Sequence, residues 1–225
     1  FYSCISIVEC ILNKILVPFY IPIKFLNSIT RTEKDLSSTK YISRFIKNNA
    51  DKIFNDISRL DDKEKRSTLI CIPNNHIGHF LCNYFNSKGL YSIFVDGNVN
   101  KEERINALNL LKQNKAIIFT LDILIEGIDI PELSRIVNLR FMNIIQYVQM
   151  IGRGLRIIRN NKYHIEKNNC EIIDYTDTPI LYADNLKKYL GIKLIKNKLF
   201  DKKVLQPDLS VIERVVNNYQ SINFV

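Results

Sequence analysis

Short apolar runs alternate with amphipathic segments through the middle of the chain. The runs are rich in β-branched residues, which predicts buried strands; they lie at 68–73, 90–95, 116–120, 135–139 and 171–175. Between the runs, apolar residues recur three and four positions apart, which predicts helices at 42–57, 77–85, 101–113 and 144–155. Strands that alternate with helices indicate an α/β fold, in which a parallel sheet is sandwiched by helices.

Both ends of the chain depart from this alternation. Residues 1–25 are apolar enough to resemble a membrane span, but Glu9, Lys14 and Lys24 interrupt them, and charges inside a span are costly. We interpret this segment as a buried helix followed by an edge strand or an extended stretch at 14–25. Beyond residue 181 the pattern predicts helices at 181–190 and 209–218, joined by a connector with Lys196, Lys198, Lys202 and Lys203.

These patterns predict three parts. They are an entry helix, strand and loop at 1–39, a main α/β domain at 40–180, and a small helical C-terminal extension at 181–225.

Composition narrows the class of protein and of partner. With 46% hydrophobic and 24% charged residues among 225, the chain is typical of a globular protein, which excludes a disordered, collagen-like or multi-span membrane chain. The net charge of +9 favours a polyanionic partner, nucleic acid before an anionic membrane. Five scattered cysteines favour a reducing, intracellular compartment over a disulfide framework. The chain begins with Phe1, so we expect a piece of a longer protein.

Three predicted strand ends carry candidate chemistry, and the carboxyl ends of parallel strands meet at one edge of a sheet. At the first, Asn74 and Asn75 precede a helix, whose backbone N–H groups favour an anion such as phosphate. The alternative is plain helix capping by Asn75. At the second, Thr120 ends a strand and is able to present its hydroxyl to a phosphate.

Further along this second strand end, Gly127 permits close backbone approach and Asp129 is able to accept hydrogen bonds from a sugar hydroxyl. For Gly127 and Pro131 alone, a structural turn is the alternative.

The third strand end leads into QMIGRGLR at 149–156. Gln149, Arg153 and Arg156 recur four and three positions apart, which predicts one helical face, and Gly152 leaves room for a ligand. Two guanidinium groups on such a face suit a triphosphate and the charge that develops during phosphoryl transfer. The alternative is a solvated basic helix face.

The order and spacing of these blocks resemble the second, C-terminal RecA-like domain of superfamily-two helicases and translocases, over roughly residues 14–178. The stretch TLICIPNN at 68–75 is similar to motif IV, and Asp96-Gly97 with Glu103-Arg104 to the block after it. Residues 120–131 are similar to motif V and residues 149–156 to motif VI. The residues of motifs V and VI look closest to those of the DEAH-like group, which includes XPB-like and restriction-enzyme-type translocases. Met150, at a position where DEAD-box proteins carry arginine, speaks against a DEAD-box helicase.

The resemblance implies a role for each matched residue. Arg156 would be the arginine finger, Arg153 a second contact to the γ-phosphate, and Gln149 a coupling residue. The nucleotide would also contact Gly127, Asp129 and Gly152. The nucleic-acid backbone would contact Thr120, Asn74 and Gly97. One departure is Asp96, which stands where histidine is common.

The chain contains neither a G-x-x-x-x-G-K-[ST] loop nor a DEAD or DEAH sequence. The resemblance therefore implies that a first RecA-like domain upstream supplies the cradle for ATP and the ligands of Mg²⁺, and that this chain alone is inactive. We expect a monomer that binds DNA or RNA and no membrane. One alternative is a catalytically inactive helicase-like module that binds nucleic acid or a partner, and another is a Rossmann-like small-molecule binder.

Two further patterns have simpler interpretations. Cys71, His76, His79 and Cys82 have the composition of a zinc site, but Cys71 falls in a predicted strand and spacings of three along a helix do not surround one metal, so we predict no metal site. The basic loop at 159–167, which contains His164, is interpreted as solvated, with nucleic-acid contact as the alternative.

Overall fold

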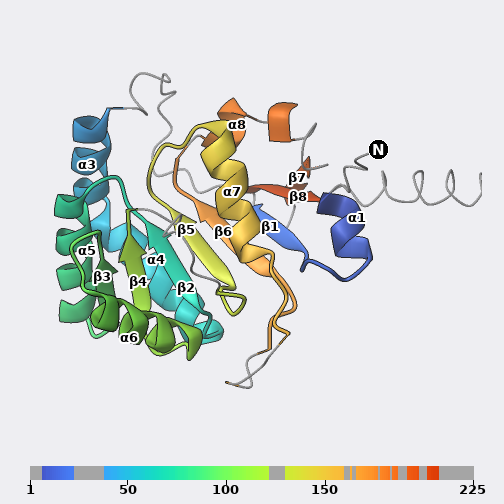
Figure 1. Cartoon of the computed structure of the whole chain (residues 1–225). Coiled ribbons are helices and arrows are strands. Elements are labelled where there is room, and N and C mark those ends of the chain that lie inside the picture. The colour runs from blue at the N-terminus through green and yellow to red at the C-terminus, as the bar shows by residue number, and fades with distance from the viewer. Residues whose placement is uncertain are drawn as a thin grey trace, which may run out of the picture.

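The computed structural model describes residues 7–22, 38–121, 130–159, 163, 166–176, 178–182, 184–186, 192–197 and 202–207. Within this part of the chain the strands are β1 (Phe19–Pro22), β2 (Thr68–Cys71), β3 (Ser92–Val95), β4 (Ile117–Thr120), β5 (Arg135–Asn138), β6 (Cys170–Asp174), β7 (Ile192–Asn197) and β8 (Lys202–Pro207). They form one sheet in the order β3-β4-β2-β5-β6-β1-β8-β7 (Figure 1). The six strands from β3 to β1 pair in parallel, and β8 and β7 continue the sheet antiparallel.

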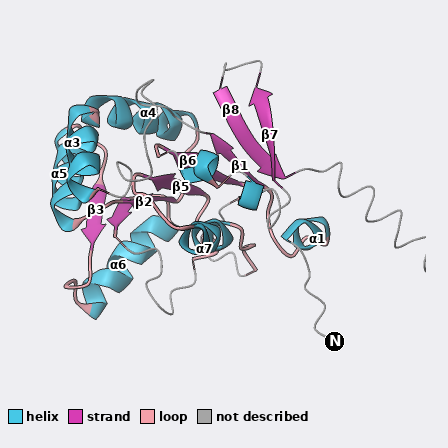
Figure 2. Cartoon of the chain, turned by 90° about the horizontal axis from the view of Figure 1, so that it is seen from above, coloured by secondary structure: helices cyan, strands magenta, loops and turns pink. Residues whose placement is uncertain are grey.

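Helices cover both faces of this sheet. They are α1 (Ile7–Leu12), α3 (Thr39–Asn48), α4 (Ala50–Lys63), α5 (Asn75–Ser87), α6 (Lys101–Lys112), α7 (Ile144–Gly154) and α8 (Thr178–Leu181). One core cluster joins α3, α4 and α5 to the sheet, and a second joins α6 and α7 to the opposite face (Figure 2). Successive strand residues alternate between the two clusters, as Leu69 and Ile70 do on β2. The predicted α/β sandwich is confirmed.

The predicted helix at 42–57 is two helices in the structure. It breaks at Asn49, whose side-chain amide donates to the carbonyl of Phe45 at 2.8 Å. An asparagine that bonds to nearby backbone competes with the helical ladder. Ile42 and Ile57 remain buried on the two sides of the break, so the apolar stripe predicted the buried face correctly but not the break.

Of the two interpretations of 14–25, an edge strand or an extended stretch, the strand is confirmed as β1, but its expected place at an edge is wrong. β1 pairs with β6 through Phe19 and Cys170, and its other side pairs with β8 through Ile21 and Leu205. This neighbour, β8, comes from the lysine-rich connector, for which no strand is predicted.

That connector forms an antiparallel hairpin, β7 and β8, and does not simply join two helices. The extension is therefore not purely helical as predicted: α8 ends at Leu181, and a short helical turn follows at 184–186. In 192–197 and 202–207, isoleucine, leucine and valine are interspersed with lysine, and the β-branched isoleucine and valine suit a strand. The predicted helix at 209–218 lies outside the described residues.

Among the helices that the structure describes, none has the length and apolar character needed to span a membrane.

Candidate functional site

Four polar or thiol-bearing side chains form a row across the carboxyl edge of the sheet. Thr120 lies opposite Cys71, Cys71 opposite Asn138, and Asn138 opposite Asp174 in the strand register. Each is at most 2% exposed. The row lies at the end of each strand on the face that α6 and α7 cover, since Cys71 belongs to that core cluster. Thr120, expected to meet nucleic acid, therefore lies inside the domain in this structure.

Asp174 is the most heavily bonded member of the row. Its carboxylate accepts from the Asn138 side-chain amide at 2.9 Å and from the backbone N–H and hydroxyl of Thr176, each at 2.7 Å. Burial raises the pKa of Asp174 from 3.8 to about 6, although these hydrogen bonds oppose the rise. Burial, followed by the proximity of Asp174, raises the pKa of Tyr147 on α7 well above its usual value. Sequence reasoning missed Asp174 and Asn138, because buried strand positions carry no motif.

Arg140 connects the row to the beginning of motif V. Its backbone N–H donates to Asn138 Oδ1 at 3.2 Å, and its guanidinium donates to the carbonyl of Leu121. The side chain therefore spans from the end of β5 to the end of β4. Sequence reasoning also missed this residue. The available signal was its position, because Arg140 is a cation two residues after the predicted strand that ends near Asn138. Gly127 and Asp129 lie outside the described residues.

The N-cap of α5 is Asn74 and not Asn75, the residue that the sequence predicts as the cap. The side-chain oxygen of Asn74 accepts from the backbone N–H of Ile77 at 2.9 Å, and its amide nitrogen donates to the hydroxyl of Ser43 at 2.7 Å. Capping, the alternative reading of this strand end, is thus confirmed with a different residue. At this helix start Asn74 is half-buried and Asn75 is exposed.

Asp96 and Gly97 follow β3, which is separated from β2 by β4 in the sheet. Asp96 accepts from the backbone N–H of Asn98 at 2.9 Å and, at 3.4 Å, from the side chain of Asn75. Gly97 is exposed, and a Cβ atom there would meet nothing within 4 Å. The Asn75–Asp96 hydrogen bond thus joins the motif IV turn to the Asp96-Gly97 turn across the end of β4, which lies between β2 and β3 in the sheet.

Motif VI occupies the end of α7 and the residues after it. Gln149 is exposed on the helix, and Gly152 and Arg153 are half-buried. The helix ends at Gly154, and Arg156 forms an antiparallel bridge with Leu16. The prediction that Arg153 and Arg156 share one helical face is therefore wrong.

The chain leaves the helix here for a physical reason. Leu155 is fully buried, and its carbonyl accepts from the backbone N–H of Val17 at 2.8 Å instead of continuing the helical ladder. The entry segment therefore terminates the helix from outside motif VI.

Lys167 joins the ends of motifs V and VI. Its ammonium group donates to the carbonyl of Pro131 and to the carbonyl of Arg156, each at 2.7 Å. Its side chain is half-buried, so interpreting the whole basic loop as solvated is wrong at this residue. His164 in the same loop lies outside the described residues.

Both cysteines and one histidine of the zinc-like pattern make packing or hydrogen-bond contacts within the domain. Burial raises the pKa of the Cys71 thiol, and the Cys82 thiol lies 3.4 Å from the carbonyl of Ser92. The ring of His79 packs edge-on against Phe94. In the described ranges, no three His, Cys, Asp or Glu residues gather in a way that could hold a metal ion.

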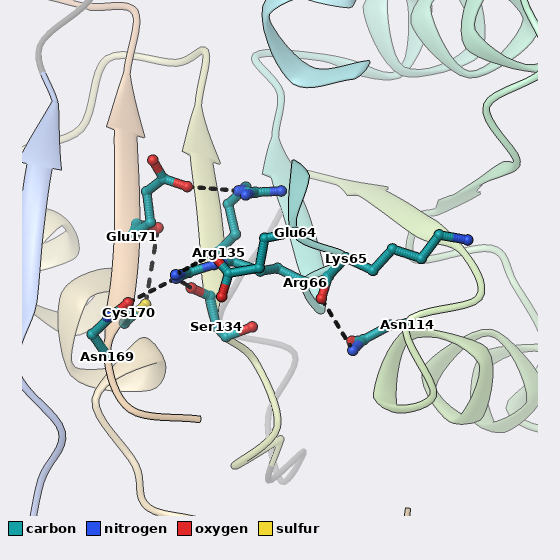
Figure 3. Close-up of polar contacts among 9 residues, drawn as sticks. All are labelled: Glu64, Lys65, Arg66, Asn114, Ser134, Arg135, Asn169, Cys170 and Glu171. Atoms are coloured by element: carbon teal, nitrogen blue, oxygen red, sulfur yellow. Dashed lines mark hydrogen bonds and ion pairs between the residues drawn. The ribbon is translucent and has the colours of Figure 1, made fainter. Parts of the chain in front are cut away.

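A second polar network lies at the opposite, amino edge of the sheet (Figure 3). Arg135 and Glu171 form a buried ion pair at 2.7 Å. Arg66, just before β2, donates to the carbonyl of Ser134 at 3.3 Å and to the side chain of Asn169 at 2.8 Å. These contacts tie together the starts of β2, β5 and β6, so this network holds the strands in register on the side away from the motifs.

Comparison with known proteins identifies the family. Residues 46–158, about half of the chain, match the model of the helicase conserved C-terminal domain. The chain belongs to this family. Its α/β fold is the RecA-like fold of helicase C-terminal domains.

Solved structures resemble the chain at low identity. The S. cerevisiae Dbp5 C-terminal domain bound to Gle1 and IP6 is 18% identical with a TM-score of 0.45, over 64% of this chain and 80% of that one. The E. coli DEAD-box protein SrmB bound to RraA is 19% identical with a TM-score of 0.46, over 62% and 79%. Helicase domain 2 of the DEAD-box protein Mss116p, bound to an RNA duplex, is 16% identical with a TM-score of 0.47, over 63% and 55%. No curated protein matches the chain.

Proposed function

We propose that this domain is the C-terminal half of an ATP-dependent nucleic-acid helicase or translocase, and that it supplies the arginine finger and part of the grip on the nucleic-acid backbone. The observation that carries the proposal is the placement of motif VI. In a chain of the helicase family, Arg153 lies in the last turn of α7, and Arg156 follows in a segment bonded to the entry strand and to Lys167. These contacts hold the backbone that carries the Arg156 guanidinium. A positioned guanidinium is what charge stabilisation during phosphoryl transfer requires.

In the proposed mechanism a first RecA-like domain of the same protein binds ATP and Mg²⁺. Closure of the cleft brings Arg153 and Arg156 to the γ-phosphate, with Gln149 and Gly152 beside them and Gly127 and Asp129 at the nucleotide. In this mechanism the chain contributes stabilising charge, and the first domain supplies the groups that orient the attacking water.

The nucleic-acid grip is proposed for the same edge of the sheet. Asn74 caps the start of α5, where backbone N–H groups favour phosphate. Gly97 lies in the turn after β3, which contacts this helix start through the Asn75–Asp96 hydrogen bond. Thr120 is 2% exposed, so its participation requires motif V to rearrange when nucleic acid binds. Backbone contacts of this kind predict little base specificity and strong dependence on salt.

We propose the DEAH-like and XPB-like group from the residues of motifs V and VI alone. Met150, at the position where DEAD-box proteins carry arginine, is 1% exposed and packs in the core beneath α7. The structures compared above are mostly of DEAD-box proteins, so they do not support the DEAH-like subgroup. An intracellular, reducing location and a monomeric state are further parts of the proposal.

The test is ATP turnover by the full-length protein that carries this domain, with and without single- and double-stranded DNA and RNA. The 225-residue chain serves as the matched control and is expected to show no turnover. Stimulation of ATP turnover by one of these polymers supports the proposal and identifies the nucleic acid on which the protein acts. A folded full-length protein that binds ATP but turns over with none of the polymers contradicts it and favours the catalytically inactive binding module.

A further inference from the structure

We infer that Lys167 is a positioning residue for Arg156, and that it locks the end of motif VI against the end of motif V. The inference rests on the proposed function of Arg156 as the arginine finger. Lys167 itself lies in neither motif, and its position in a basic loop gives no sequence signal of this role.

The geometry of one ammonium group carries the inference. Lys167 Nζ donates to the carbonyls of Pro131 and Arg156 at 2.7 Å each, so two segments 25 residues apart share one donor group. An ammonium group has three protons, and both bonds are charge-assisted. Because the Arg156 carbonyl follows the C-terminal end of α7, the cation also lies where the helix dipole favours positive charge.

The same segment is held on another side by main-chain bonds. Val17 N–H donates to the carbonyl of Leu155 at 2.8 Å, and Leu16 bridges to Arg156. These contacts connect motif VI to the residues just before β1, whereas Lys167 connects it to motif V. A shift of Pro131 would therefore be transmitted through Lys167 to the backbone that carries the finger.

Three variants separate this role from general stability. Lys167→Met keeps the aliphatic stem and removes the donors, Lys167→Arg keeps the charge, and Lys115→Met is a matched control at an exposed lysine. In the full-length protein we expect Lys167→Met to lower kcat by about 10²-fold through misplacement of the finger. The KM for ATP and the midpoint of unfolding should stay near wild type. Lys167→Arg should restore part of kcat, and Lys115→Met should change nothing.

A second readout in the 225-residue chain does not depend on turnover. The Val17 amide reports on the Leu155–Arg156 segment, and the Ile72 amide, bonded to the carbonyl of Thr120, is the internal reference. Lys167→Met should speed hydrogen exchange at Val17 about tenfold and leave Ile72 unchanged.

The outcomes are distinguishable from failure of the proposed function. Unchanged exchange at Val17 overturns the inference, as does faster exchange with unchanged kcat. If the wild-type full-length protein has no turnover, the arginine-finger role fails with the proposed function, and the exchange at Val17 still decides whether Lys167 fixes this segment.

Discussion

A Cβ atom on Gly154 would lie 2.4 Å from the sulfur of Cys170 and 3.1 Å from Ile136 Cδ1. Gly154 therefore lets the last turn of α7 pack directly on β5 and β6. At Gly152, two residues earlier on the same helix, a Cβ atom would meet nothing within 4 Å. The two glycines of motif VI therefore differ: Gly154 is required for close packing, whereas there is room for a side chain at Gly152.

Gly154→Ala should destabilise the chain, because the added methyl group overpacks the core. We expect a loss of about 1–3 kcal/mol in the free energy of unfolding, measured by urea denaturation. Gly152→Ala is the matched control and should stabilise by up to about 1 kcal/mol, since alanine favours a helix interior. If Gly152 approaches nucleotide, the same variant lowers ATP turnover in the full-length protein. Equal effects of the two substitutions on stability would contradict this division.

Asp174 should make stability depend on pH. Its pKa is about 6 in the folded chain against 3.8 ordinarily, so the folded state binds the proton more tightly than the unfolded state does. The free energy of unfolding should therefore fall as the pH rises from about 4 to about 6, by on the order of 3 kcal/mol, and this contribution should level off above that range. Urea denaturation at stepped pH measures the slope. Asp174→Asn should flatten it, and an unchanged slope in this variant would show that another group is responsible.

The Arg135–Glu171 pair should tolerate double replacement better than single replacement. Arg135→Met or Glu171→Leu alone leaves a buried charge uncompensated, which costs about 3–5 kcal/mol in unfolding free energy. The double variant removes both charges and should be more stable than either single variant. Denaturant unfolding of all four proteins gives the coupling, and near-UV circular dichroism shows which are folded. Additive losses would mean that the two side chains do not act as a pair.

Asn74→Asp should separate helix capping from nucleic-acid binding. The aspartate keeps an oxygen for the Ile77 N–H, so unfolding free energy should change by less than about 1 kcal/mol. The new negative charge at the proposed phosphate site should weaken nucleic-acid affinity, measured by fluorescence anisotropy at several salt concentrations. Asn75→Asp, exposed one residue later, is the comparison and should weaken binding less. Unchanged affinity in Asn74→Asp removes this residue from the grip.

Arg156→Ala in the full-length protein should lower kcat by on the order of 10³-fold, as expected for loss of an arginine finger. Nucleic-acid affinity should stay close to wild type, because the proposed contact is to nucleotide. Arg159→Ala, an exposed arginine just beyond the motif, is the matched control and should retain turnover. Near-normal kcat in Arg156→Ala would refute the assignment.

Periodicity predicted the central elements well, because each depends on local pattern. The strands β2 to β6 and the helices α5, α6 and α7 all lie within the predicted ranges or a few residues beyond them. Their apolar positions face the core at spacings of two or of three and four, and that spacing is visible in the chain itself. The positions of Asn74 and of motif VI at strand and helix ends followed from the same reasoning.

The candidate site was only partly predictable. Its motifs are local, but the groups that hold them come from distant parts of the chain. Lys167 reaches Pro131 from 36 residues away, and Arg140 reaches the carbonyl of Leu121 from 19 residues away. A lysine that bonds to two carbonyls cannot be distinguished in sequence from a solvated lysine.

The sequence by itself determined the α/β class, the order of the central elements and the residues of the motifs, because hydrophobic spacing and motif composition are local properties. Only the tertiary structure decided that β1 lies inside the sheet, that α7 ends before Arg156, and that Asp174 is buried with a raised pKa. Each of these depends on a partner far along the chain, namely β8, Val17 and Asn138. Strand pairing, helix termination and desolvation are set by what packs nearby, and that is known only once the chain has folded.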